Sequence, residues 1–312
     1  MHEAKLLPAP AWVRLAATII RRLPAGRYRA MNRVSRRPPS AFLMQAPEEL
    51  GGYVFKCDLR DSMAREVCFT GRYEPQETAL VRAILRPGMT FVDGGANWGY
   101  FTLLAAHLVG ESGRVISLEP DPRLFPILQE NVRRNELSQV TTLQLAAADR
   151  PGTLTLAGYD ERNGNWGLSK LIDRPALGST TFQVASQRLD AVLDEHRIDE
   201  VDLLKMDIEG AEDLALRGMS VGLARHRHRR ILLEVHPTIL AERGRTARDV
   251  LELLTENGYV GWWIDHSLVG TRRVAYTRSP DPRHLLRPLC AAGPLDAWPH
   301  MLWLSPGLEP LS

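Results

Sequence analysis

The sequence has few cysteines and no long apolar run, and both shortages exclude classes of protein. Its three cysteines, Cys57, Cys68 and Cys290, are odd in number and stand far apart. Neither a disulfide framework nor a metal-binding knuckle can be drawn from them, which fits a reducing cytoplasm. No apolar stretch approaches the ~20 residues of a membrane-spanning helix, and the start lacks the pattern of a signal peptide. We therefore expect a cytoplasmic protein without a transmembrane segment.

Acidic residues are missing from one long segment near the N-terminus. Between Arg14 and Arg37 there are eight arginines and no aspartate or glutamate, although the net charge of the whole chain is only +2. Apolar residues at helical spacing from Trp12 to Leu23 predict a short amphipathic helix there. Such a helix could touch an anionic membrane or nucleic acid. We favour a helical lid on the domain or a contact within a homo-oligomer, with solvated arginines.

The composition is ordinary for a globular protein, with 44% hydrophobic and 24% charged residues. The 312 residues suffice for one large α/β domain with attachments. We divide the chain into an Arg-rich extension over 1–52 and a main domain over 53–312. Mixed apolar spacing over 53–69 predicts a short β-hairpin region, and Pro75 to Leu85 predicts a helix that Pro87-Gly88 ends.

Strand and helix patterns alternate through the rest of the chain. Expected strands lie at 90–92, 114–118, 140–145, 201–206, 231–235 and 259–264, and expected helices at 98–109, 122–135, 211–217 and 247–257. Successive strand–helix–strand units predict a mostly parallel sheet with helices on both faces, which is a Rossmann-like α/β fold. We interpret 150–190 as a cap beside the site, 266–297 as a flap, and Met301 to Leu304 as a last strand.

A glycine-rich turn follows the strand at 90–92, but it lacks the spacing of a dinucleotide site. Gly94, Gly95 and Gly99 do not fit the G-x-G-x-x-G register that sets a helix N-terminus against a pyrophosphate. Without a Cβ atom, Gly95 and Gly99 let the backbone bend tightly and approach a ligand closely. Asn97 and Tyr100 complete the segment that opens the following helix.

An acid stands at the end of each of the first two strands of this unit. Asp93 would repel a phosphate, whereas S-adenosylmethionine (SAM) has no phosphate and carries a positive ammonium and sulfonium. Glu119 can accept hydrogen bonds from both ribose hydroxyls of a nucleoside at the carboxyl ends of the strands. The charges favour SAM over NAD, with an NAD-dependent oxidoreductase as an alternative. Asp149, after three alanines, either accepts from the adenine amine or forms a turn.

A second acidic cluster lies at a later strand-to-helix junction, where Asp207 ends the strand and Glu209 lies in the turn. These carboxylates could bind the SAM amino group, accept a proton from the substrate hydroxyl, or hold a divalent cation. Because no partner acids are identifiable, we do not favour Mg²⁺ and expect no metal. His236 ends the next strand and can accept a proton near neutral pH.

Several segments together resemble the FkbM family of methyltransferases, in order and in spacing. The matching segments are Tyr73-Glu74-Pro75, 91–100, Glu119-Pro120, 205–212 and 234–237. The resemblance implies a class I seven-stranded fold, SAM as cofactor, and methylation of a hydroxyl on a sugar, glycan or polyketide-type product. It also implies a SAM site with Asp93, Gly95, Asn97, Gly99 and Glu119, a cofactor or substrate contact at Glu74, and reaction-centre acids at Asp207 and Glu209. Gly94 departs from the aliphatic residue commoner at its position.

The mechanism we expect is direct displacement of the methyl group by a substrate oxygen. His236 is the preferred base and Asp207 the second choice. Trp166 is a candidate surface on which a sugar ring stacks, although an ordinary packed tryptophan fits as well. The arginines of 14–37 and 225–230 raise a nucleic-acid methyltransferase as a rival. Against it, the Asn/Asp-Pro-Pro-Tyr type of loop used by amino-methylating enzymes is absent, so we expect a small-molecule acceptor and no nucleic acid.

Overall fold

The computed structural model describes residues 6–159, 164, 166, 169–172, 180–277, 281–289 and 299–311. Cys290 and parts of the expected cap at 150–190 and flap at 266–297 lie outside these residues. Within the described ranges, no helix is both long enough and apolar enough to cross a membrane.

A central sheet of eight strands organises the part of the chain that the structure describes, in the order β13-β12-β14-β11-β10-β3-β4-β5. Its strands are β3 (Thr90–Gly94), β4 (Arg114–Leu118), β5 (Val140–Leu143), β10 (Leu203–Met206), β11 (Arg230–Glu234), β12 (Val260–Ile264), β13 (Leu286–Pro288) and β14 (His300–Leu304). From β11 to β5 neighbouring strands run parallel, whereas β14 runs antiparallel to both β11 and β12. The expected α/β fold and last strand are therefore confirmed.

The segment expected as a flap adds an eighth strand to the expected seven. Its described residues form α12 (Leu268–Ala275), a 3₁₀ turn η3 (Pro282–Leu285) and β13, which pairs antiparallel with β12 at the sheet edge. The expectation of a flap alone was wrong for β13. Without β13, β12 would be the edge strand and its outer backbone groups would lack hydrogen-bond partners; β13 pairs with them.

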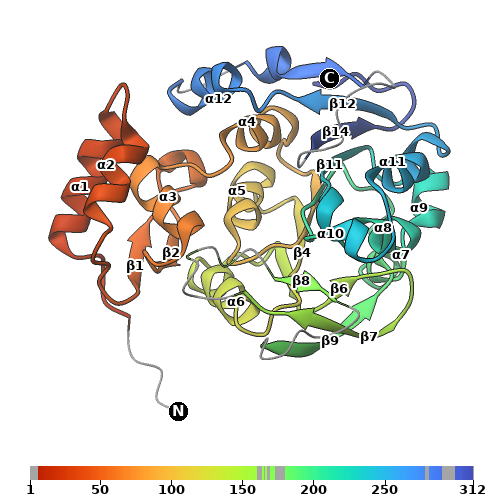
Figure 1. Cartoon of the computed structure of the whole chain (residues 1–312), viewed down its shortest axis with the longest axis horizontal. Helices are drawn as coiled ribbons and strands as arrows, with labels where there is room; N and C mark the ends of the chain where they lie inside the picture. The colour runs from red at the N-terminus through yellow and green to blue at the C-terminus, as the bar shows by residue number, and fades with distance from the viewer. Residues whose placement is uncertain are drawn as a thin grey trace.

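Helices cover both faces of the sheet because successive strand residues point to opposite sides. Phe91 and Val115 belong to one apolar cluster, and the adjacent Val92 and Ile116 belong to another. The first face packs on α4 (Pro75–Ile84), α5 (Tyr100–Val109) and α6 (Phe125–Arg134). The second packs on α7 (Leu189–Glu195), α8 (Glu212–Arg217), α9 (Ser220–Ala224), α10 (Pro237–Glu242) and α11 (Ala247–Thr255). Figure 1 shows the helices around the sheet.

The N-terminal region corrects one expectation about local structure. It contains α1 (Ala11–Arg22), α2 (Arg27–Val34), β1 (Phe42–Gln45), η1 (Glu48–Leu50), β2 (Val54–Cys57) and α3 (Ser62–Thr70). The β-hairpin expected over 53–69 was wrong, because β2 pairs antiparallel with the earlier β1 and α3 follows it. The Asp61 side chain caps α3 by accepting from the Ala64 amide, and Gly71 ends the helix in a left-handed conformation.

The domain boundary expected between residues 52 and 53 does not coincide with a structural break. It falls between β1 and β2, which are hydrogen-bonded to each other. Phe42 on one side of it and Phe55 and Leu104 on the other belong to the same apolar cluster. The extension is therefore continuous with the core of the domain. Figure 1 shows α1 and α2 at the left edge, with α3 between them and the sheet.

The described part of the expected cap forms a second, smaller sheet. Its strands are β6 (Ala146–Ala147), β7 (Gly152–Ala157), β8 (Lys170–Leu171) and β9 (Thr181–Gln187), in the order β6-β9-β7-β8. Ala146, Leu156 and Leu171 line the cavity described next. This sheet therefore forms one wall of the site.

Candidate functional site

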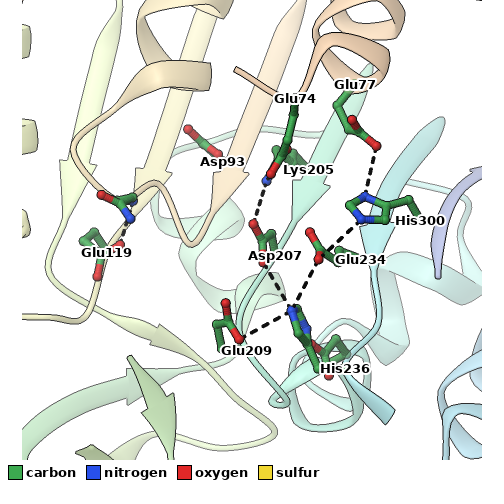
Figure 2. A network of polar contacts seen from close by, with 12 residues as sticks. Glu74, Glu77, Asp93, Glu119, Lys205, Asp207, Glu209, Glu234, His236 and His300 are labelled. Atoms are coloured by element: carbon green, nitrogen blue, oxygen red, sulfur yellow. Dashed lines mark hydrogen bonds and ion pairs between the residues drawn. The ribbon is translucent and has the colours of Figure 1, made fainter. Parts of the chain in front are cut away.

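A cavity of about 1240 Å³, counted with its open mouth, lies at the carboxyl ends of the central strands. This is where open α/β sheets bind their ligands. Its charged lining consists of Glu74, Glu119, Lys205, Asp207, Glu209, Glu234 and His236. Five of these seven side chains are acids and two are basic. Figure 2 shows Glu74, Lys205, Asp207, Glu209, Glu234 and His236 close together, with Glu119 apart from them.

The glycine-rich turn lines the cavity and also packs closely against the loop that contains Asp207. Gly95 has φ +79°, and a Cβ atom there would lie 1.9 Å from the carbonyl oxygen of Asp207. Gly99 has φ +101°, with Leu128 Cδ1 2.8 Å from its virtual Cβ. At Gly94 a Cβ would lie 3.3 Å from the Lys205 carbonyl oxygen, which leaves little room for an aliphatic side chain. Gly95 is therefore required by the packing of two site loops.

Glu119 lines the cavity, and backbone amides fix its carboxylate. Its Oε2 accepts from the Asn97 amide at 2.7 Å and its Oε1 from the Asp121 amide at 2.8 Å. Burial raises the pKa of Glu119 to about 8, although both amides lower it. Each carboxylate oxygen has a second acceptor site, so two further hydrogen bonds can be accepted from a ligand. Asn97 and Tyr100 also line the cavity.

Asp93 and Asp149 lie off the cavity surface, among the residues that the structure describes. Asp93 is buried beneath the turn, where its Oδ2 accepts from Thr102 Oγ1 at 2.7 Å. Burial raises the pKa of Asp93, and the nearby Lys205 opposes this shift. The alanines before Asp149, Ala146 and Ala147, do line the cavity. Any influence of Asp93 on a ligand would therefore act through its charge and its support of the turn.

His236 is surrounded by four carboxylates. Its Nδ1 lies 2.7 Å from Glu212 Oε1, and its Nε2 lies 3.5 Å from Glu209 Oε2. Nε2 also lies 3.5 Å from Glu234 Oε1 and 3.8 Å from Asp207 Oδ1. Burial by itself lowers the pKa of His236, but Glu212 and the other acids outweigh it and raise this pKa to about 9. His236 is thus an imidazolium at neutral pH, with Nε2 directed at the cavity acids (Figure 2).

Lys205 is the second cation of the site. It lies on β10, two residues before Asp207, so both side chains project from the same side of the chain. Its Nζ donates to Asp207 Oδ2 at 3.2 Å and lies 3.9 Å from Glu74 Oε2. Burial by itself raises the pKa of Asp207, but the positive charges of Lys205 and His236 outweigh burial, and this pKa lies below its ordinary value. Asp207 is therefore ionised at neutral pH.

Glu74 and Glu209 share an uncommon backbone conformation. Their φ angles are 41° and 47°, in the left-handed region that few residues other than glycine adopt. Burial raises the pKa of each to about 7. Glu74 Oε2 is buried and accepts no hydrogen bond from the described part of the chain. This leaves a buried acceptor at the cavity, and such groups cluster at functional sites.

Behind the cavity lies a second cluster that the sequence did not predict. His300 Nε2 lies 3.4 Å from Glu234 Oε1, and its Nδ1 lies 3.0 Å from Glu77 Oε1. His266 Nε2 lies 2.7 Å from the same oxygen of Glu77. Glu234 lies between His300 of this cluster and His236 of the cavity, and burial raises the pKa of Glu234 to about 8. Glu77 and His300 have no local signal, because 222 residues of chain separate them and they meet only in the fold.

Three groups of side chains in the described residues bring possible metal ligands within 4.8 Å of one another. Two face the cavity, Asp207 with Glu209 and His236, and Glu74 with Asp207 and Glu234. The third is Glu77 with His266 and His300. At the cavity, Lys205 already supplies positive charge to Asp207 and Glu74. A divalent cation would have to compete with it, so a metal-independent site stays our prediction.

Trp166 is packed against the protein away from the cavity lining. Its ring stacks on Tyr159 with 5.5 Å between centroids, and the Arg60 guanidinium lies 5.6 Å from its centroid. It is 6% exposed. These contacts fit a structural tryptophan better than a free stacking surface. Asn163, Asn165 and Gly167, its neighbours in the expected acceptor loop, lie outside the described residues.

Comparison with known proteins identifies the family of the central segment. The profile described as "Methyltransferase FkbM domain" matches residues 93–260, more than half of the chain. Methyltransferase sdnD of Sordaria araneosa is 30% identical over 154 residues, which cover 41% of this chain and 59% of that protein. 2-O-methyltransferase NoeI of Sinorhizobium fredii is 26% identical over 189 residues, covering 56% and 74%.

The matched region is shorter than the first of these relatives. It spans 59% of the Sordaria protein and 57% of Methyltransferase 1 of Beauveria bassiana, less than two thirds of each. A crystal structure of methyltransferase FkbM from Methylobacillus flagellatus aligns with a TM-score of 0.40 and 16% identity, covering 93% of this chain and 60% of that one. With a TM-score this low, the family assignment rests on the sequence match.

Proposed function

We propose that this chain, which belongs to the FkbM methyltransferase family, transfers a methyl group from SAM to a hydroxyl of a small molecule. The observation that carries the proposal is the acid-lined cavity at the carboxyl ends of β3, β4, β10 and β11. Five lining carboxylates suit a ligand with positive ammonium and sulfonium groups. They disfavour a pyrophosphate, and with it a nicotinamide dinucleotide.

The residues present fit SAM at this cavity. Glu119 has free acceptor capacity for the ribose hydroxyls, since each oxygen takes only one backbone amide. Glu74 Oε2 is a buried acceptor without a hydrogen bond, suited to an ammonium group. Gly95 and Asn97 form the turn beside these acids and line the same cavity. Asp93 supports the turn from below through Thr102.

The chemistry that SAM supplies is an electrophilic methyl group, so the protein mainly has to orient the acceptor and take up a proton. Orientation of reactants alone can lower a barrier by ~7–11 kcal/mol. His236 Nε2 faces the cavity and takes the hydroxyl proton when the imidazole is neutral. Asp207, ionised at neutral pH, is the second candidate. Glu209 lies 3.5 Å from His236 Nε2 and stabilises the charge that His236 gains.

A hydroxyl acceptor is supported by the printed activity of one relative, the 2-O-methyltransferase of Sinorhizobium fredii. The lining of the cavity mixes acids with apolar side chains such as Met63, Tyr73 and Leu156. Such a lining suits a small molecule with both apolar and hydroxyl-bearing parts. We therefore propose a sugar, glycan or polyketide-type product as the acceptor class.

Equilibrium binding tests the cofactor. Titration calorimetry with SAM, S-adenosylhomocysteine and NAD should detect the first two ligands only. Glu119→Gln should weaken SAM binding at least about tenfold, because a ribose contact to a carboxylate is worth ~1.5–3 kcal/mol. Glu130→Gln is the matched control, since Glu130 pairs with arginines on the outer face of α6. Binding of NAD but not SAM would overturn the proposal.

Product identification tests the acceptor. The protein is incubated with methyl-labelled SAM and an extract of its own cells, and the labelled product is identified by mass spectrometry. An O-methylated small molecule is the expected product. Label on RNA or DNA would replace the small-molecule acceptor with a nucleic acid while leaving SAM dependence intact.

A further inference from the structure

The first helix and the residues just before it expose apolar side chains that the described part of the chain does not cover. Leu7, Trp12, Leu15 and Ile19 are 71%, 45%, 62% and 54% exposed. They are four of the eight large apolar side chains that are exposed in the part of the chain that the structure describes. Trp12, Leu15 and Ile19 follow one another at spacings of three and four residues, so they lie along one side of α1.

The opposite side of α1 is already packed on the protein. Val13, Ala17 and Ile20 are buried in the main apolar cluster. Arg21 anchors the helix by donating to the Cys68 carbonyl at 2.8 Å, and α1 packs against α3. The helix thus has two apolar sides, of which the inner one is packed in the core.

Arginines accompany the exposed stripe. Arg14 and Arg22, both exposed, stand four residues on either side of Thr18 and so form a row next to Leu15 and Ile19. Four more exposed arginines follow nearby in the chain, at positions 29, 33, 36 and 37. No acid occurs between Arg14 and Arg37 to neutralise them.

We propose that this surface docks on an anionic membrane. Trp12, Leu15 and Ile19 enter the boundary between headgroups and acyl chains, and Arg14 and Arg22 bind lipid phosphates. Amphipathic helices with arginines beside aromatic and aliphatic residues bind the membrane plane in this way. The proposal does not depend on the methyl acceptor, because lipid binding needs neither SAM nor substrate.

Two other partners fit this surface less well. A nucleic acid would satisfy the arginines but would leave Leu15 and Ile19 facing phosphates and water. A second copy packed by two-fold symmetry would bury the apolar stripe, but it would also bring the arginine rows of both copies together without an acid between them. An anionic lipid surface, in contrast to both, offers an apolar layer and negative charge at once.

The proposed surface lies one helix away from the cavity. α1 packs on α3, and Met63 of α3 is part of the cavity lining. Figure 1 shows α1 at the outer edge of the molecule and α3 directly inside it. Docking would therefore hold the cavity near the membrane without covering the central sheet.

Vesicle flotation of the full chain tests the proposal. The protein should float with vesicles of phosphatidylcholine and phosphatidylglycerol and not with vesicles of phosphatidylcholine alone. The salt concentration is about 0.1 M, at which charges on the two surfaces still attract each other over about 10 Å. Combined Leu15→Ser and Ile19→Ser should weaken binding at least about tenfold. Arg14→Gln and Arg22→Gln should each weaken it about fivefold. Circular dichroism checks that every variant is folded.

The matched control removes exposed apolar residues elsewhere. Val221→Ser and Val260→Ser, at side chains that are 45% and 56% exposed, should leave vesicle binding unchanged. The proposal fails if the folded protein does not bind anionic vesicles, or if the α1 and control variants lose binding equally. It also fails if the α1 substitutions instead dissociate a dimer, or abolish binding to RNA, while vesicle binding is unaffected.

Discussion

Two histidine–carboxylate clusters lie on either side of Glu234, and only one of them lines the cavity. His236 Nε2 and His300 Nε2 lie 3.5 and 3.4 Å from the same oxygen of Glu234. Both histidines are surrounded by acids that raise their pKa, to about 9 for His236 and about 10 for His300. His236 lines the cavity, whereas His300 is enclosed between Glu77 and Glu234. The two histidines therefore have similar acidic surroundings, but only His236 can reach a ligand in the cavity.

The direction of β14 explains how the two clusters meet. His236 follows directly after β11, at the carboxyl end of a parallel strand. His300 begins β14, which runs antiparallel to β11 and pairs with it so that His300 lies opposite Glu234. The start of an antiparallel strand thus reaches the same sheet edge as the ends of the parallel ones. We propose that the first cluster transfers protons and the second supports its geometry.

Removal of the cavity histidine should have the largest effect. We expect His236→Ala to lower kcat by about 10²–10³, because general bases contribute about 10²–10⁴. The affinity for SAM should change only a few-fold, since Glu119 and Glu74 remain. Single-turnover kinetics with a labelled acceptor and calorimetry separate these quantities. An unchanged kcat would remove His236 from the mechanism.

Substitution at Gly95 should loosen the first cluster through its loop. Gly95→Ala combines a left-handed backbone with a Cβ atom 1.9 Å from the Asp207 carbonyl oxygen. We expect the free energy of unfolding to fall by about 2–5 kcal/mol, from backbone strain and overpacking together. Gly26→Ala is the control, because Gly26 has φ +76° and nothing within 4 Å of a virtual Cβ. It should cost only about 1–2 kcal/mol in chemical denaturation. Equal losses would contradict the close packing of the two loops.

The pH profile distinguishes the two candidate bases. His236 accepts a proton only when neutral, and its pKa of about 9 leaves it protonated at pH 7. If it is the base, kcat/KM, which reports the pKa values of the free enzyme, should rise about tenfold per pH unit from pH 7 and level off above pH 9. A profile flat from pH 6 upward would assign the role to Asp207, whose pKa is lowered.

The same titration affects stability in the opposite direction. The folded-state pKa of His236 lies above its ordinary value of 6.5, so its ion pairs stabilise the fold fully below pH 6.5. That contribution is lost as the pH rises through about 9. Activity should therefore rise over the pH range in which this part of the stability is lost, which thermal unfolding at each pH can check.

Removal of the second histidine should have the smallest effect on turnover. We expect His300→Gln to lower the free energy of unfolding by about 1–3 kcal/mol, because it removes a charged partner from the buried Glu77 and Glu234. kcat should stay within a few-fold of the unsubstituted protein. Loss of turnover comparable to that of His236→Ala would make the two clusters one functional unit.

Sequence patterns located most of the central fold because their signals are local. The strands before Asp93, Glu119 and Asp207 were predicted from short apolar runs that end in a polar turn. The region over 53–69 was misinterpreted although Asp61 and Gly71 mark the two ends of α3, because the apolar spacing between them is irregular. Capping residues were a better guide there than periodicity.

The sequence by itself determined which strand ends carry acids, where the glycine-rich turn lies, and which family the chain resembles. These features depend on residues that are neighbours along the chain. Only the tertiary structure decided that Lys205 pairs with Glu74, that Gly95 is needed by the Asp207 loop, and that His300 meets Glu234. Such contacts join segments far apart in sequence, and they follow from strand order and packing rather than from any local pattern.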